Sequence, residues 1–463
     1  RRDNQIDEQG NRLVTNTESN GRFHTDWLNM MYPRLKLARD LLTEDGVIFI
    51  SIDDNEIENL KKICNELFGE RNFIGEVIRK TKSMTADNGN GFNLQHENLM
   101  IYAKSKNNVY LLGKEKEFQN YSNPDSDPNG DWCSGDPSAK SGGNTTYFPI
   151  KNPYTNKVDY PPKGRYWAFS QYTLKGYIDR GRIKFKESHG ENERGFIFKR
   201  YRNDVTSIYN PVNSLFALEN DFMNQSATTE LNKLFEEAIF SYPKPTMYIY
   251  ELVKYSCKGD SDIILDFFSG SSTTAHAVLQ LNAADNGNRK FIMVQLPENT
   301  DAKSEAFKAG YKNICEIGKE RSRRAGNKIK EEMGLTAQSL DIGFRVLKLD
   351  ESNMNNVYYS PDEYKETNFK FEDLIENVKP GRTHEDILFQ VMLELGVPLS
   401  AKINFDGNII TVDDNYLVAC FDTVDTDMVT KIAKMQPYYA VFRESSFIND
   451  SSLINVDQIF NTY

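Results

Sequence analysis

Residues 263–278 are the part of this 463-residue sequence with the clearest chemical character. They form a short apolar run that ends in Asp266, a turn of small residues that contains Gly270, and the start of a helical pattern. A strand, a turn and a helix in this order present free backbone N–H groups at the carboxyl end of the strand, where open α/β sheets bind ligands. The turn can therefore hold a nucleotide cofactor. Because it lacks both the dinucleotide glycine spacing and the Gly-Lys-Ser/Thr of a phosphate loop, an ordinary tight turn is the alternative.

A second candidate is the basic stretch at residues 151–210, which has 13 Lys and Arg against 6 Asp and Glu. Aromatic residues are interleaved with these charges, namely Tyr166, Trp167, Phe169, Tyr172, Phe185, Phe196 and Phe198. Basic side chains neutralise phosphates and aromatic rings stack on bases, so the pattern favours contact with nucleic acid over a merely solvated surface. The net charge of −11 does not oppose this, because residues 341–463 alone have 21 acidic and 10 basic side chains.

The elements around the first stretch predict an interrupted α/β sheet. A helix–strand–helix unit of a parallel sheet is expected at residues 25–67, around a buried strand at 47–52. A similar unit returns at residues 248–295, with strands at 263–265 and 291–295. The sheet is therefore expected to resume after a long interruption.

The remaining sequence divides into an insertion and a C-terminal part. Residues 105–240 are rich in Asn, Gly, Pro and aromatic residues and show only short strand signals, which indicates an inserted domain. A basic helix over residues 306–333 is expected to present a charged outer face or to contact phosphate. From Asp341 onward we expect a small acidic domain that begins with a helix capped by Thr383. Its other expected elements are strands at 409–412, 416–421 and 439–442 and a helix at 426–435.

Composition excludes several classes of protein. Hydrophobic residues make up 39% of the chain and aromatic residues 12%, which predicts a globular protein of two or three domains. No apolar run approaches the roughly 18 to 20 residues that cross a bilayer, and residues 1–20 have no apolar signal-peptide core, so we expect a cytoplasmic protein. The five cysteines are far apart and only five histidines accompany them, so we expect reduced thiols and no metal site.

Several motifs carry a resemblance to a known family. Asp266-Phe267-Phe268-Ser269-Gly270-Ser271 resembles the cofactor loop of the amino-group DNA methyltransferases, and Tyr242-Pro243-Lys244-Pro245 resembles the Lys-Pro element that precedes that loop in their permuted β class. Residues 289–298 are similar to the next strand and ribose-side loop of the type III modification subunits. Further similar segments are residues 16–30, His96-Glu97 with Tyr102, residues 160–167 and residues 309–312. The chain thus resembles the modification subunit of a type III restriction-modification system over nearly its whole length.

The resemblance implies an α/β fold of the S-adenosylmethionine-dependent methyltransferase type, with a Rossmann-like sheet, an inserted target-recognition domain and a smaller α+β C-terminal domain. In this class the catalytic half precedes the insert and the cofactor half follows it, which accounts for the interrupted sheet. The implied domains are residues 1–104 (first part of the methyltransferase core), 105–240 (target-recognition insert), 241–338 (cofactor-binding part of the core) and 339–463 (C-terminal assembly domain).

The resemblance also implies a cofactor and its residues. S-adenosylmethionine is expected against the loop at residues 266–273, with Gln295 or Glu298 near the ribose and Lys244-Pro245 near the methionine end. The cofactor-binding candidates are Lys244, Pro245, Asp266, Phe267, Phe268, Ser269, Gly270, Ser271, Thr273, Gln295 and Glu298.

The implied activity is methyl transfer to the exocyclic amino nitrogen of adenine in duplex DNA, with the target base swung out of the stack. The DNA-binding candidates are Lys163, Arg165, Tyr166, Trp167, Arg182, Lys184, Lys199, Arg200 and Arg202. Implied partners are double-stranded DNA, a helicase-nuclease restriction subunit and a second copy of the chain. Two alternatives remain open: a non-catalytic module for DNA recognition and assembly, and an enzyme that methylates the amino group of cytosine.

The sequence departs from the family at two points. The family places an Asp-Pro-Pro-Tyr tetrapeptide ahead of the region matched here, and none occurs in this sequence, so no catalytic residue is assigned. Because the catalytic strand of the implied fold lies beside the cofactor strand, we expect a gap or a repacked sheet between residues 263–265 and 47–52. Ser272 also stands where the family usually has glycine, so its side chain is expected either to crowd the cofactor or to point into solvent.

Five other polar residues have ordinary structural explanations. Asp53 and Asp54 follow a strand, and the expected role is to cap the next helix. His96-Glu97 has no second histidine nearby, so strand packing is expected and not metal binding. His276, at the start of the helix after the turn, is expected to pack in the interior.

Overall fold

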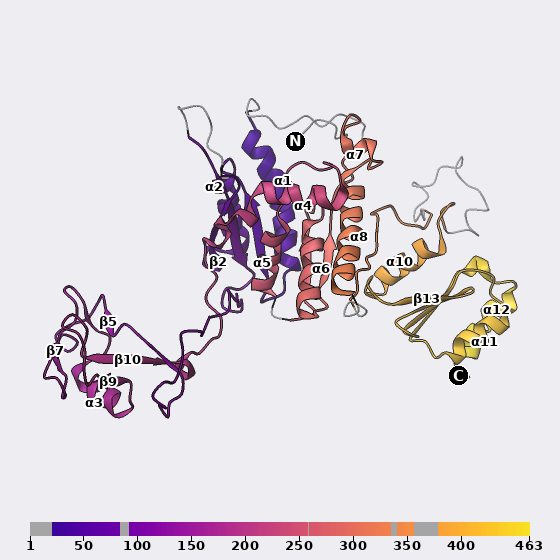
Figure 1. Cartoon of the computed structure of the whole chain (residues 1–463). Helices are drawn as coiled ribbons and strands as arrows, with labels where there is room; N and C mark the ends of the chain where they lie inside the picture. Colours follow the sequence, from indigo (N-terminus) through magenta and orange to yellow (C-terminus); the bar gives the residue numbers. More distant parts are fainter. Residues whose placement is uncertain (1–20, 84–91, 258, 335–339, 356–377) are drawn as a thin grey trace. The chain divides into compact units, whose positions relative to one another are not determined.

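The computed structural model of the chain describes residues 21–83, 92–257, 259–334, 340–355 and 378–463. It divides into two compact units, Arg1–Ile342 and Gly343–Tyr463. Both units combine helices with strands, so the predicted α/β class with a smaller α+β C-terminal part is confirmed (Figure 1). None of the helices in the described ranges is long and apolar enough to cross a membrane. Residues 16–20 of the similar segment 16–30 lie outside the described part.

The first sheet contains the strand predicted at residues 47–52. Its order is β1 (Val47–Ile52), β3 (His96–Ala103) and β2 (Phe73–Lys80), and both pairings are antiparallel. The expectation of a parallel neighbour for β1 is therefore wrong within the described residues, because the chain folds back after β2 and places β3 between β1 and β2. Helices α1 (Phe23–Leu41) and α2 (Ile57–Phe68) cover one face of this sheet through a shared hydrophobic core.

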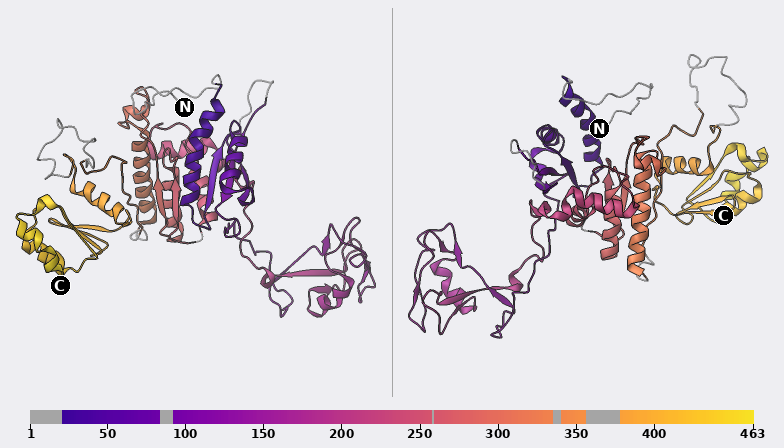
Figure 2. Two further views of the ribbon diagram at one scale, coloured as in Figure 1. Left: turned by 180° about the vertical axis from the view of Figure 1, so that it is seen from behind. Right: turned by 45° about the horizontal axis from the view of Figure 1, so that its top comes forward.

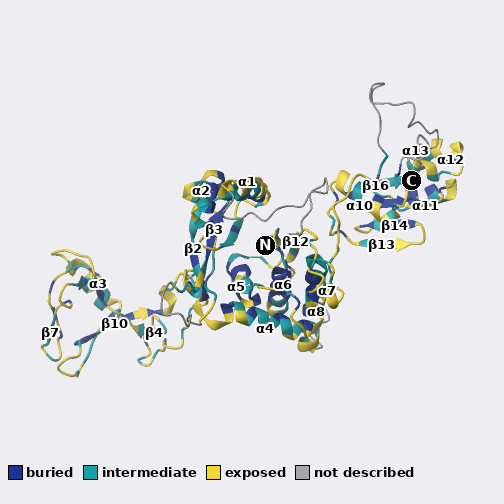
Figure 3. Cartoon of the chain, turned by 90° about the horizontal axis from the view of Figure 1, so that it is seen from above, coloured by how far each residue is buried: buried dark blue, intermediate teal, exposed yellow. Residues whose placement is uncertain are grey.

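The second sheet holds the stretch with the clearest chemical character. β11 (Ile263–Asp266) and β12 (Lys290–Met293) pair in parallel, and α6 (Thr273–Asp285) connects them. α5 (Thr246–Ser256) and α6 pack on one face, and α6 is buried along most of its length (Figure 3). α5 also packs against one face of the first sheet, so it lies against both sheets (Figures 1 and 2).

As predicted, β1 and β11 are not hydrogen-bonded to each other, since they belong to separate sheets in the described residues. The face of β11 and β12 that is opposite α5 and α6 is largely uncovered, because Ile263 and Ile292 on that face are 65% and 50% exposed. The two sheets nevertheless meet at one point. Phe267, directly after β11, packs against the hydrophobic core of the first sheet, as do Ile50 and Ile52 of β1.

The basic helix expected at residues 306–333 is two helices. α7 (Glu305–Lys308) ends before Gly310, whose φ of +95° is readily adopted only by glycine. α8 (Ile314–Met333) begins after Asn313, whose side chain caps the helix by accepting a hydrogen bond from the Glu316 backbone. The helical periodicity of the sequence runs through this break, which explains the error.

The expected insert has small sheets and one helix. β4 (Trp132–Ser134), β10 (Phe196–Tyr201) and β9 (Ile183–Phe185) form an antiparallel sheet in the order β4-β10-β9. Its other elements are β5 (Ser138–Ala139) paired with β8 (Tyr166–Trp167), β6 (Ile150–Lys151) paired with β7 (Val158–Asp159), and α3 (Gln171–Asp179). α4 (Asn224–Phe235), which follows, packs on α8, so the last part of residues 105–240 belongs with the helices of the core.

The C-terminal unit is a four-stranded sheet with helices on both faces. Its strands are β13 (Ile403–Asp406), β14 (Ile409–Val412), β15 (Leu417–Cys420) and β16 (Tyr439–Phe442), and only β15 and β16 pair in parallel. α10 (His384–Glu394) packs on one face, and α11 (Thr426–Lys434) and α13 (Val456–Phe460) pack on the other, with α12 (Asp450–Ile454) beside α13. Thr383 caps α10 in a capping box with Asp386, as predicted.

Candidate functional site

The candidate site lies at the carboxyl ends of β11 and β12. Asp266 ends β11, and its carboxylate accepts hydrogen bonds from the Phe268 backbone (3.1 Å) and the Thr274 hydroxyl (2.6 Å). Gly270 adopts a φ of +52°, and its backbone N–H donates to Oε1 of Gln295 at 2.8 Å. The acid therefore stabilises the first half of the turn, and the glutamine after β12 holds the second half.

The predicted cofactor-binding residues are brought together at this edge. Ser269, Ser271 and Thr273 are buried, whereas Phe268 is 51% exposed. Phe267 packs against the core of the first sheet, Glu298 is partly exposed after β12, and Lys244-Pro245 lies immediately before α5. The Thr273 hydroxyl donates to the Lys244 carbonyl at 3.3 Å, which joins the loop to the Lys-Pro element.

Ser272 does not face solvent. It adopts the left-handed conformation (φ +59°), and it is only 7% exposed. Its side chain lies against Gly318 of α8, where a Cβ atom would approach Ser272 Oγ to 2.5 Å. The expectation that the side chain points into solvent is therefore wrong, because a glycine on a distant helix leaves the space that the serine fills, and the expectation that it crowds the cofactor stays a prediction.

Arg321 lies beneath the loop and was missed as a site residue. Its side chain is fully buried, and Nη1 donates to the hydroxyls of Ser271 (2.9 Å) and Thr273 (2.8 Å) while Nη2 donates to that of Thr246 (2.9 Å). Burial lowers the pKa of Arg321 to about 10, and the carboxylate of Glu230, 3.7 Å from Nη2, opposes that shift. The expectation of an outer face or a phosphate contact is wrong for this arginine. Its place on the apolar stripe of α8 was the available signal.

Lys244 belongs to a second charged network. Its ammonium lies 2.5 Å from Oε1 of Glu97, the same oxygen that accepts from Nε of the fully buried Arg79 at 2.8 Å. Burial alone would raise the pKa of Glu97, but Arg79 and Lys244 outweigh it and the pKa is lowered. Burial lowers the pKa of Lys244, and Glu97 opposes this. Glu97 lies in β3 opposite Arg79 of β2, as its expected role in the strand requires, and its ion pair with Lys244 was not predicted.

The other structural explanations have mixed outcomes. Neither Asp53 nor Asp54 caps α2, whose N-cap is Glu56; Asp53 instead accepts a hydrogen bond from the Asn55 backbone at 3.2 Å. His276 is buried as expected, and burial lowers its pKa to about 3. Its ring is therefore neutral at physiological pH. Among the described residues, no group of three or more His, Cys, Asp or Glu side chains is placed to hold a metal ion.

Most aromatic residues of the basic stretch form the interior of the insert. Trp167, Phe169 and Phe196 are buried in one core, with Phe185 and Phe198 partly buried against it. Their spacing among basic residues reflects core packing, so the inference of base stacking is wrong for these five. Tyr172, in contrast, is 86% exposed.

The basic candidates separate by exposure. Lys163, Arg200 and Arg202 are exposed. Three others are partly engaged by carboxylates: Arg165 with Asp136, Arg182 with Asp204 and Lys184 with Asp125. Lys199 is 2% exposed and Trp167 is 1% exposed, so neither side chain presents a surface to DNA.

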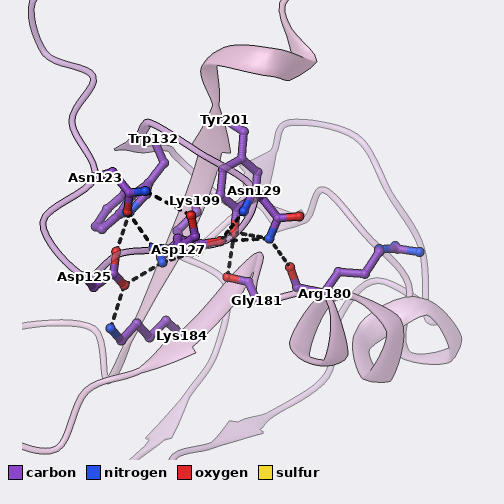
Figure 4. Close-up of polar contacts among 10 residues, drawn as sticks. All are labelled: Asn123, Asp125, Asp127, Asn129, Trp132, Arg180, Gly181, Lys184, Lys199 and Tyr201. Atoms are coloured by element: carbon purple, nitrogen blue, oxygen red, sulfur yellow. Dashed lines mark hydrogen bonds and ion pairs between the residues drawn. The ribbon is translucent and has the colours of Figure 1, made fainter.

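Lys199 instead organises an acidic turn (Figure 4). Its ammonium lies 2.7 Å from Asp125 and 2.5 Å from Asp127, and 4.5 Å from the centroid of the Trp132 ring. Tyr201, two residues further along β10, donates to the same oxygen of Asp127 at 2.8 Å. Hydrogen bonds from Lys184 and Lys199 lower the pKa of Asp125. Burial alone would raise the pKa of Asp127, but hydrogen bonds from Lys199, Asn129 and Tyr201 outweigh burial, and the pKa is lowered. The lysine thus occupies the centre of the turn as its counter-ion.

A cavity of about 430 Å³ opens on the surface of the insert. It is lined by Asn144, Tyr147, Gly164, Arg165 and Tyr166. Tyr147 is 50% exposed and its ring contacts that of Tyr166 edge-on at 6.2 Å. Two DNA-binding candidates therefore meet at one opening that an aromatic ring borders.

Comparison with known proteins adds sequence relatives. Residues 6–322 match the family model described as DNA methylase. The Mod subunits of three type III restriction-modification enzymes are similar: StyLTI of Salmonella typhimurium (34% identity, 70% of this chain, 48% of the relative), EcoPI of Escherichia phage P1 (32%, 73% and 55%) and EcoP15I of Escherichia coli (30%, 77% and 60%). The chain thus spans about half to three fifths of the length of these relatives.

Proposed function

The chain belongs to the DNA methylase family, and from this premise we propose that it acts in the modification subunit of a type III restriction-modification system. In this proposal it binds S-adenosylmethionine at the loop after β11 and recognises duplex DNA, whose adenine amino group receives the methyl group. The type III Mod subunits among its relatives support the system, and adenine as the target base is what the resemblance of its motifs implies.

One observation carries the cofactor assignment. The loop of small residues turns its side chains inward, with Ser271 and Thr273 buried, and the glycine in its middle adopts a positive φ. A backbone without bulky side chains is thereby left at the carboxyl end of a parallel strand, which suits a nucleoside ligand. The exposed ring of Phe268 offers an apolar surface for a purine, and Gln295 and Glu298 supply polar groups for a ribose. These residues fit the cofactor.

S-adenosylmethionine, when bound, supplies an electrophilic methyl group. The chain's own residues bind and orient: Lys244 places a cation near the site for the methionine carboxylate, held there by Glu97. The residues that contact the reacting amine are not assigned, because the family's tetrapeptide does not occur in this sequence.

Recognition of DNA is assigned to the insert at residues 105–240. Lys163, Arg200 and Arg202 are exposed there, and the tyrosine-bordered cavity next to Arg165 gives room for an inserted DNA group. Replacing Arg200 and Arg202 with alanine is expected to weaken duplex binding roughly equally for all sequences and to reduce its salt dependence. The exposed Lys431 of the C-terminal unit, replaced by alanine, is the matched control.

Two assays test the proposal as a whole. Titration with S-adenosylmethionine by calorimetry is expected to show one site, which the Asp266→Asn variant weakens. Transfer of tritiated methyl groups to duplex DNA, followed by nucleoside analysis, distinguishes adenine from cytosine as the target. Binding without transfer would favour the alternative of a recognition and assembly module. Absence of cofactor binding by the full chain would contradict the proposal.

The proposal also includes protein partners. The C-terminal unit is acidic and unsuited to DNA, so we assign it to contacts with the helicase-nuclease restriction subunit. A second copy of the chain and a cytoplasmic location complete the proposal. Co-purification of the chain with and without residues 343–463 against the restriction subunit tests the first assignment.

A further inference from the structure

We infer that Arg321 is a positioning residue for the donor site, because its buried guanidinium holds the small-residue loop and the turn after Lys244-Pro245 in a fixed relation. The inference rests on the proposed function, since it concerns how that same site keeps its shape. No contact between Arg321 and the donor itself is involved.

The geometry of the guanidinium supports this role. Its two terminal nitrogens donate to Ser271 and Thr273 of the loop and to Thr246 at the start of α5. The three donor–acceptor distances are 2.8 to 2.9 Å, the usual range for such bonds. Because the group is planar and rigid, it sets the separation of the two segments and does not merely attract them.

The energetic cost of the arrangement argues against a purely structural role. A fully buried guanidinium loses its hydration, and its one nearby counter-ion in the described interactions, Glu230, is 3.7 Å away and already accepts a 2.5 Å hydrogen bond from Thr246. Buried ionic groups of this kind are often replaced by packed apolar residues with no loss of stability. An apolar side chain on α8 would fill the space, but it would leave the hydroxyls beneath the loop without donors.

The contacts also determine which side of the loop faces outward. Ser271 and Thr273 are 3% and 6% exposed, because their hydroxyls turn inward to Arg321. These two side chains therefore do not occupy the outer side of the loop, where the donor is proposed to bind. Without the guanidinium the two side chains lose their inward partner, and the loop samples other conformations.

Replacement of Arg321 tests the inference in the full chain. Arg321→Met removes the charge with little change in volume, and Arg321→Lys keeps the charge but loses the fork of donors. Binding of S-adenosylmethionine, measured by calorimetry, is expected to weaken roughly tenfold to a hundredfold in Arg321→Met, the loss of one or two charge-assisted hydrogen bonds, and less in Arg321→Lys. Arg323→Met, a change at an exposed arginine of the same helix, is the matched control and is expected to bind normally.

Two further measurements separate positioning from general destabilisation. Without any donor present, hydrogen exchange at residues 269–273 is expected to accelerate in Arg321→Met and to stay unchanged in Arg323→Met. In a double-mutant cycle, the effects of Arg321→Met and Ser271→Ala on donor binding are expected to be non-additive, since both changes break the same hydrogen bond.

The outcomes distinguish the inference from the proposed function. If the wild-type chain binds S-adenosylmethionine and folded Arg321→Met binds it equally well, or the cycle with Ser271→Ala is additive, the inference is overturned and the proposed function stands. If Arg321→Met does not fold, Arg321→Lys decides, and wild-type affinity in that variant overturns the inference. If the wild-type chain does not bind the donor at all, the proposed function fails and the inference fails with it.

Discussion

Substitution of Gly318 by alanine probes how closely α8 approaches the loop after β11. The added Cβ would lie 2.5 Å from Ser272 Oγ and 3.4 Å from the Gly270 carbonyl oxygen. Atoms in van der Waals contact need roughly 3.5 Å, so the serine hydroxyl or the helix must move by about 1 Å. The contact with Gly270 is tight but tolerable. Ser272 is therefore the residue that makes alanine unfavourable at position 318.

The expected magnitude follows from opposing effects. Overpacking of this kind costs about 1 to 3 kcal/mol. Alanine in a helix interior is favoured over glycine by about 1 kcal/mol, so Gly318→Ala alone is expected to lower the free energy of unfolding by about 0 to 2 kcal/mol. Ser272→Gly removes the obstacle and suits the φ of +59°. In that background Gly318→Ala is expected to raise the free energy of unfolding by about 1 kcal/mol, which gives a coupling energy of about 1 to 3 kcal/mol.

Hydrogen exchange of the four proteins measures this coupling at the right place. Amides of α6 and α8 report the local opening free energy, and about 1.4 kcal/mol corresponds to a tenfold change in protection. The matched control is Gly326→Ala on the same helix, whose Cβ would meet Ile342 and not the loop, so its effect is expected to add to that of Ser272→Gly. Equal effects of Gly318→Ala in both backgrounds, within about 0.5 kcal/mol, would refute the reasoning.

Three other predictions concern charged and titratable groups. Lys199→Met leaves Asp125 and Asp127 without their buried cation. The free energy of unfolding of the insert, measured by urea titration with tryptophan fluorescence, is therefore expected to fall by about 3 kcal/mol or more. The pKa of Asp127 is lowered in the folded chain, so the stabilisation is present above the unfolded pKa of about 4 and lost as pH falls below it. An acid titration should show a smaller loss in Lys199→Met than in wild type, because Asn129 and Tyr201 still donate hydrogen bonds to Asp127. Glu97→Gln removes the carboxylate that raises the pKa of Lys244, so amine labelling of Lys244, followed by mass spectrometry, is expected to begin at lower pH than in wild type. His276 has a folded pKa of about 3, below its unfolded value of about 6.5, so stability should decrease as pH falls from about 6.5 towards 3, and His276→Gln should flatten that dependence in thermal unfolding scans.

Local periodicity predicted elements well where neighbours in sequence decide the structure. The strand at residues 439–442 and the cap at Thr383 both depend on a short hydrophobic run or on one side chain, and both are confirmed. Strand pairing depends on distant segments, and so the antiparallel neighbour of β1 was missed. The break at Gly310 was missed for a related reason, since a helical repeat continues on either side of a short turn.

The sequence predicted the loop of the candidate site but not the residues behind it that hold it in place. Sequence motifs located Asp266 and Lys244, because their resemblance to a family is local. Arg321 and Glu97 contribute through contacts across 50 and 147 positions of the chain, to Ser271 and Lys244 respectively, and no local pattern encodes such pairs.

The same limit applies to the insert, where composition could not separate two uses of one residue type. Aromatic residues near basic ones suit both stacking on bases and packing in a small core, and Trp167 does the latter. Lys199 likewise lies in a basic run, yet it neutralises an acidic turn that begins 74 residues earlier. Exposed members of the run, such as Arg200, present a charged group that a phosphate can reach, whereas the ammonium of Lys199 is buried.

The two charged networks behind the loop share one element, the helix α4 that follows the insert. Arg79 donates to the side chain of Asn224 at 2.8 Å at the start of α4, and Glu230 further along the helix accepts from Thr246 and lies near Arg321. Arg79 in turn holds Glu97 and thereby Lys244, so α4 contacts the supports of both the Lys-Pro element and the loop. A displacement of α4 would therefore break the hydrogen bond from the buried Arg79 to Asn224 in one network and separate the buried Arg321 from Glu230, its nearby carboxylate, in the other. The position of α4, the first α-helix after the insert, is therefore coupled to the geometry of the proposed donor site.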